Sequence, residues 1–116
     1  MAISTNTEAH AIFKVMNQAA VDLANHTAVA SVDTDIDVEM GDGEDQNPLK
    51  SGDLIIGPFP AAAGAGIAAL EAGIAVVSNV YKDANTITMR TTNPSAGAIN
   101  PASIAANAIY WLVVRF

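Results

Sequence analysis

The stretch from residue 26 to residue 40 reads HTAVASVDTDIDVEM, and its side chains alternate in character along the chain. The even positions carry Ala28, Ala30, Val32, Ile36, Val38 and Met40. The odd positions carry Asp33, Asp35, Asp37 and Glu39. A period of two predicts a β-strand with one buried and one solvated face. Because the run is longer than an ordinary strand, we expect a bend or break between Ser31 and Thr34.

Two later parts of the chain also predict strands. Residues 74–81 (IAVVSNVY) and 86–92 (TITMRTT) flank the turn-forming residues 82–85, and this pattern predicts a β-hairpin. Residues 108–115 are apolar at odd and even positions alike. A strand that is apolar on both faces is typical of the centre of a sheet or of a surface covered by a partner.

The segments between these strands are rich in turn-forming residues. Residues 54–56 (LII) predict a short buried strand that stops before Pro58 and Pro60, because proline cannot donate to a ladder. The polar residues 41–52 predict a loop. Residues 61–73 contain several glycines and predict one helical turn or an irregular crossing over the end of the sheet.

The N-terminal residues 5–25 follow a helical period. Thr5 and Glu8 have the spacing of a capping box. The apolar positions of this period are Ile12, Phe13, Met16, Ala19, Ala20 and Leu23. The pattern predicts an amphipathic helix, although the chain from Val21 onward also fits the start of an extended arm. Such a segment either packs on its own domain or reaches a neighbouring subunit.

Several short strands with turn signals predict a mainly β fold. We expect an antiparallel β-sandwich or open barrel, jelly-roll-like, with an N-terminal helix or arm. The expected division is an N-terminal helix or arm over residues 1–25 and a single β-sandwich domain over residues 26–116.

The composition indicates a protein that associates with other subunits. Among 116 residues there are 23 alanines but six aromatic side chains. Apolar burial is worth roughly 25 cal/mol per Å², so an alanine-rich core gains little per residue. Contacts with further copies would supply the missing burial. The absence of cysteine excludes disulfides and thiolate metal sites.

Charge and hydropathy argue against two classes of partner. The formal net charge is −7, and the five basic residues are scattered, whereas nucleic-acid binding needs clustered Lys and Arg. No apolar run approaches the roughly 20 residues of a membrane span. The N-terminus lacks the pattern of a signal peptide. We therefore expect synthesis in the cytoplasm and no nucleic-acid or membrane partner.

The aspartates of the alternating stretch superficially resemble the start of a calcium loop. Counted from Asp33, that loop needs glycine at its sixth position, which is Val38 here. Carboxylates on one strand face lie about 7 Å apart, which is too far for one ion. We expect no metal site, and interpret Asp33, Asp35 and Asp37 as a solvated acidic face or a face that docks onto basic residues.

Other polar residues fit no catalytic or cofactor motif. The loop residues Asp42, Glu44 and Asp45 lack the Gly-Lys-Ser/Thr ending of a phosphate-binding loop. The remaining candidates are His10, His26, Gly64 and Gly66. Neither histidine has a partner at motif spacing, and the two glycines do not make a dinucleotide fingerprint. We expect no enzymatic activity and no cofactor.

Six apolar side chains are the candidate interface residues. They are Ile12, Phe13, Met16, Tyr110, Trp111 and Phe116. Aromatic residues often dominate binding energy at interfaces, but in a domain with few of them they equally suit the core. Parity places Trp111 on one face of its strand and Tyr110 on the other.

The order of signals from about Ala20 to Phe116 resembles small virion proteins of tailed phages. The quoted segments are the alternating strand, SGDLII over 51–56 closed by prolines, LEAGI over 70–74, DANTIT over 83–88, and TNPSAGAINPAS over 92–103 before a terminal apolar strand. The set looks like the capsid decoration, or cement, type. The acidic loop 41–50 and the N-terminus depart from that pattern and leave the mode of attachment open.

This resemblance implies a structural role. Cement proteins are added to an expanded shell, often as trimers, and stabilise it. We therefore expect a homotrimer that contacts a major capsid protein on the outer capsid surface of a virion. Another phage structural subunit, such as a tail-tube, head-fibre or baseplate component, is the alternative.

Overall fold

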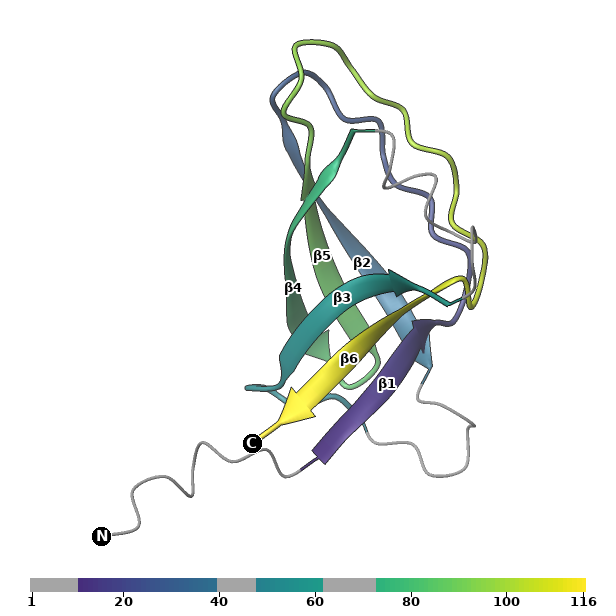
Figure 1. The fold of residues 1–116 in the computed structure, drawn as a ribbon, viewed down its shortest axis with the longest axis vertical. Coiled ribbons are helices and arrows are strands. Elements are labelled where there is room, and N and C mark those ends of the chain that lie inside the picture. The colour runs from purple at the N-terminus through teal and green to yellow at the C-terminus, as the bar shows by residue number, and fades with distance from the viewer. Residues whose placement is uncertain (1–10, 40–47, 62–72) are drawn as a thin grey trace, which may run out of the picture.

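The structure is a computed structural model that describes residues 11–39, 48–61 and 73–116. Among these residues all regular secondary structure is β-strand (Figure 1). Its strands are β1 (Ala11–Asn17), β2 (Ser31–Glu39), β3 (Leu54–Pro60), β4 (Ala75–Asp83), β5 (Thr86–Thr92) and β6 (Ile109–Arg115). All neighbouring strands are antiparallel. This architecture confirms the expected mainly β antiparallel fold.

The six strands form one sheet in the order β3-β6-β1-β2-β5-β4. The sheet curls into a nearly closed barrel, so that β3, β6 and β1 lie on one wall and β2, β5 and β4 on the other (Figure 1). The two edge strands, β3 and β4, meet across a seam at which Asn79 Nδ2 donates a hydrogen bond of 2.8 Å to the carbonyl oxygen of Gly57. Barrel closure of this kind leaves little free sheet edge.

The expected helix over residues 5–25 is wrong for the described part of that segment. Ala11–Asn17 forms β1, which pairs with β6 from Ala11 to Met16 and with β2 at its C-terminal end. Val15 is fully buried. Pairing with β6 and β2, which are distant in the sequence, favours a strand over a helix for these residues. The apolar side chains of β1 fit this strand because both of its faces are partly covered.

The alternating stretch behaves as expected. Ile36 and Val38 are buried, whereas Asp33, Asp35 and Asp37 are exposed. β2 begins at Ser31, which is where the break in the long run was expected. The predicted hairpin is also present, because β4 and β5 pair across a short turn.

The prediction that the strand beginning at Leu54 stops before the prolines is wrong. Strand β3 continues through Pro60, with a register shift between Ile56 and Phe59, after which Phe59 pairs with Tyr110. Proline is tolerated because β3 is an edge strand that bonds to β6 on one side. The expectation that 54–56 is a buried strand is also wrong in part, because Leu54 and Ile56 face outward and Ile55 faces inward.

The connections 18–30 and 93–108 run side by side beyond one end of the barrel (Figure 1). Val21 bridges to Ile104, and His26 bridges to Ile99. Asn17 ties the base of the pair together: its side chain donates to the carbonyl of Ala105 and accepts from the amide of Ile109. The two long connections therefore form one extension of the barrel rather than free loops.

The core lies between the two walls of the barrel. Its central members are Val15, Ile36, Val38, Ile55, Ile87, Met89, Ile109, Trp111 and Val113. In the described residues, no buried side-chain nitrogen or oxygen lacks a hydrogen-bond partner. The interior is thus apolar with its few polar groups satisfied, as stable domains require.

Candidate interaction surface

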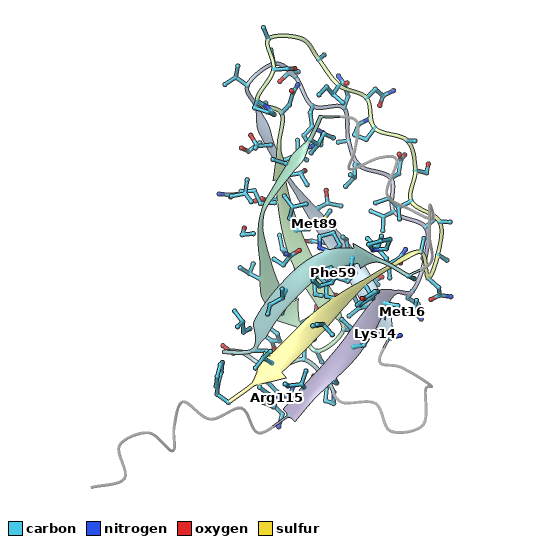
Figure 2. The ribbon with its side chains drawn as sticks, viewed as in Figure 1. Lys14, Met16, Phe59, Met89 and Arg115 are labelled. Carbon is cyan, nitrogen blue, oxygen red and sulfur yellow. The ribbon has the colours of Figure 1, made fainter. Side chains whose placement is uncertain are left out.

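The outward side of β3, β6 and β1 presents a row-by-row array of apolar side chains, here called the apolar sheet face. Its three cross-strand rows are Ile12, Val114 and Leu54; Lys14, Leu112 and Ile56; and Met16, Tyr110 and Phe59. Residues directly opposite on one face of a sheet touch, so these rows make a continuous surface. Figure 2 labels Lys14 and Met16 on β1 and Phe59 on β3.

This face is unusually apolar for a solvated surface. The exposed fractions are 66% for Ile12, 48% for Leu54, 42% for Ile56 and 36% for Leu112. Antiparallel sheets normally place polar residues on their wet side. Contiguous apolar patches of more than a few hundred Å² mark interaction sites in soluble proteins. The apolar sheet face therefore has the character of a contact surface.

Two aromatic rings lie in the last row of the face, next to the lysine of the middle row. The Tyr110 and Phe59 rings lie 5.3 Å apart between centroids, and Lys14 Nζ lies 5.4 Å from the Tyr110 centroid. Both rings are half-buried. Tyr, Phe and Met are enriched at protein interfaces, and the two rings pack against each other at a tilt of 35° between their planes.

The outward side of β2, β5 and β4 has a different chemistry and is here called the acidic sheet face. Arg90 binds Asp33 through two hydrogen bonds of 2.7 and 3.0 Å, and Lys82 pairs with Asp35. The hydrogen bonds from Arg90 lower the pKa of Asp33, and those from Lys82 and Thr88 lower the pKa of Asp35. The carboxylates of Asp33 and Asp35 are therefore charged at neutral pH.

A second row of the acidic sheet face holds two carboxylates around one threonine. Asp37 and Asp83 both lie opposite Thr86, whose hydroxyl donates to Asp37 Oδ1 at 3.2 Å. The amide of Asn85 donates to Asp83, which lowers the pKa of that carboxyl. Within the described residues, neither carboxylate forms an ion pair. This row therefore concentrates negative charge, which the nearby Lys82 offsets only in part because it is paired with Asp35.

A more buried ion pair joins β6 to the turn before β3. Arg115 donates to Asp53 through hydrogen bonds of 3.0 and 2.7 Å, and the Asp53 side chain is 3% exposed. The hydrogen bonds from Arg115 lower the pKa of Asp53. The guanidinium also lies 5.0 Å from the centroid of the Phe13 ring. These contacts fix the end of β6 against β1 and β3.

The structure separates the six predicted interface residues. Ile12, Met16 and Tyr110 lie on the apolar sheet face, and Phe116 is 50% exposed just beyond β6. Phe13 is half-buried and packs against the core. Trp111 is fully buried and donates to Asn79, so it takes the core role that the sequence left open, and it offers no surface to a partner.

Three of the four exposed aliphatic side chains of the face were missed from the sequence: Leu54, Ile56 and Leu112. Their strands are apolar at both parities, which hides the outward positions in an apparently buried run. The two-sided apolar pattern of residues 108–115 was the available signal, because one explanation of such a strand is cover by a partner.

The other candidate residues do not assemble into a further site. His26 is buried, with Nδ1 donating to the carbonyl of Ala24 at 2.6 Å and Nε2 lying 2.7 Å from Thr91 Oγ1. Among the described residues, no group of three or more His, Cys, Asp or Glu could hold a metal ion. The candidates that lie outside the described residues are His10, Met40, Asp42, Glu44, Asp45, Gly64 and Gly66.

No helix in the described part of the chain is long and apolar enough to cross a membrane. Comparisons of this chain with protein-family models, with curated proteins and with solved structures find no match.

Proposed function

We propose that this chain is a structural virion protein that decorates and stabilises the outer surface of a phage capsid through protein–protein contacts. The apolar sheet face is the observation that carries the proposal. A small β-barrel with exposed Ile and Leu side chains beside half-buried Met and Tyr side chains is suited to packing on other proteins.

The resemblance of the segment from Ala20 to Phe116 to cement proteins supports the same role. The charge distribution is compatible with it, because a chain of net charge −7 is repelled by packaged DNA and suits the outside of a shell. In this role the chain performs no reaction. Its partners are further copies of itself, in a homotrimer, and a major capsid protein.

The location of the chain on virus particles tests the proposal. Particles would be purified from a lysate, labelled with an antibody against the chain and imaged by electron microscopy. The proposal predicts label on the outer surface of the head. Label confined to tails or baseplates would replace it by another structural role, and particles that lack the chain would contradict it.

A further inference from the structure

We propose that the apolar sheet face of one copy packs on the acidic sheet face of a second copy, in a head-to-tail contact. The inference deepens the proposed function, and rests on it for the expectation that copies associate. It names the two surfaces that meet and the geometry of the contact.

Charge distinguishes a head-to-tail contact from a contact between two apolar sheet faces. Among the nine described side chains that make up the three rows of the apolar sheet face, Lys14 is the one charged residue. A contact between identical faces would bring two of these lysines onto one interface, where none of the nine residues supplies a carboxylate, and this is unfavourable because desolvated charges need partners.

The acidic sheet face supplies the missing charge. Among its described side chains it carries Asp33, Asp35, Asp37 and Asp83 against Arg90 and Lys82, so four carboxylates less two cations leave a net charge of −2. The row of Asp37, Thr86 and Asp83 holds the two carboxylates without an ion pair in the described residues. Lys14 of a second copy is a suitable cation for this row.

The acidic sheet face also supplies apolar contact area. Val80 lies opposite Thr88 on its outward side and is 52% exposed, and Val77, at a bulge of the same edge strand, is 57% exposed. These valines offer an apolar patch to Ile12, Ile56 and Leu112 of the neighbour. The acidic sheet face, with apolar side chains beside carboxylates, is therefore complementary to the apolar sheet face, with apolar side chains beside a lysine.

The small size of a single apolar patch favours an arrangement in which each copy makes the contact twice, once with each face. A stable interface buries about 800 Å² on each partner, whereas an apolar patch like this one contributes a few hundred Å². In a head-to-tail arrangement every copy uses both faces, and the contacts form a ring, as in the proposed homotrimer, when the rotation between neighbours closes. Each copy in such a ring is then held by two contacts rather than one.

Mixing two complementary variants tests the head-to-tail geometry. Leu112→Glu damages the apolar sheet face, and the double variant Asp37→Lys with Val80→Lys damages the acidic sheet face. Val29→Glu is the matched control, because Val29 is 76% exposed and lies on neither face. Sedimentation velocity would give the mass of each, and thermal unfolding would verify that each is folded. If Leu112→Glu fails to fold, Lys14→Glu replaces it.

We expect wild type and the Val29→Glu control to associate, and each damaged variant to remain at the monomer mass of 11.9 kDa with at least tenfold weaker self-association. An equimolar mixture of the two damaged variants should form a dimer held by one contact, weaker than the wild-type assembly, because each variant retains the face that the other lost. A monomeric mixture, or a wild type that stays monomeric, would overturn the inference. Location on virus particles is measured separately, so failure here is distinguishable from failure of the proposed function.

Discussion

The indole N–H of Trp111 donates a hydrogen bond of 2.8 Å to Asn79 Oδ1, and this bond joins the core strand β6 to the edge strand β4. Asn79 also donates to the carbonyl of Gly57 in β3, so one amide connects the core to both sides of the seam. The barrel, and with it the apolar sheet face on β3, β6 and β1, depends on this seam.

Replacing Asn79 with alanine should therefore destabilise the fold. The change leaves the Trp111 N–H and the Gly57 carbonyl without these partners, and each unsatisfied buried group costs about 1–3 kcal/mol. Urea unfolding would measure the loss. Asn100→Ala is the control, since Asn100 is exposed and the expected change is within about 0.5 kcal/mol. Equal stability of the two variants would show that the seam does not need the amide.

Gly57→Ala should be destabilising for a separate reason. Gly57 has a φ of +148°, and an added Cβ would lie 2.9 Å from Trp111 Cδ1 and 3.0 Å from the Tyr110 carbonyl oxygen. We expect a loss of about 1–3 kcal/mol from the clash and the strained backbone. At Gly97 an added Cβ meets nothing within 4 Å, so Gly97→Ala should be close to neutral. Thermal unfolding of both variants would decide, and a neutral Gly57→Ala would contradict the close packing at the seam.

The ion pair between Asp53 and Arg115 should make stability depend on pH. The folded-state pKa of Asp53 is lowered, so its stabilising contribution is complete above the unfolded pKa of about 3.9 and is lost as the pH falls through the folded value. Asp53→Asn should therefore cost about 1.5–3 kcal/mol at pH 7, and the difference from wild type should shrink below about pH 4. Denaturant unfolding at pH 7, 5, 4 and 3 would measure it, and a difference independent of pH would contradict it.

Val29 offers a substitution that should stabilise the chain. Its φ of +55° is in the left-handed region, which β-branched residues rarely adopt, and its side chain is 76% exposed. Val29→Asn should relieve about 1 kcal/mol of strain, since asparagine tolerates this conformation and Asn107 already adopts it at φ +58°. Val77→Asn, in β4, should bring no gain because a strand favours valine. Thermal unfolding in which Val29→Asn lowers the melting temperature would count against this account.

Much of the fold follows from local patterns in the sequence. The alternation around Asp33 and Asp35 defines which side of β2 is buried, and the turn at 82–85 joins two adjacent strands. These features rest on residues close in sequence, where period and turn chemistry are informative. They were sufficient to predict a mainly β antiparallel fold and the presence of an acidic sheet face.

The remaining features depend on pairings between distant residues. Ile12, Phe13 and Met16 fit a helical period as well as a strand, and the choice is made by β6, about 100 positions later in the chain. The exposure of Leu54 and Ile56 likewise follows from the position of β3 at the sheet edge, which no local pattern specifies. Three of the four exposed aliphatic side chains of the apolar sheet face, those of Leu54, Ile56 and Leu112, were therefore not predicted as surface residues from the sequence alone.

The mass of the purified wild-type chain in solution, measured by sedimentation equilibrium over rising concentration, tests most directly whether the outward side of β3, β6 and β1 joins proteins together. We predict a mass that rises above the 11.9 kDa monomer to a small closed assembly. A chain that remains at 11.9 kDa at every concentration would contradict the claim that these exposed Ile and Leu side chains are covered by another copy.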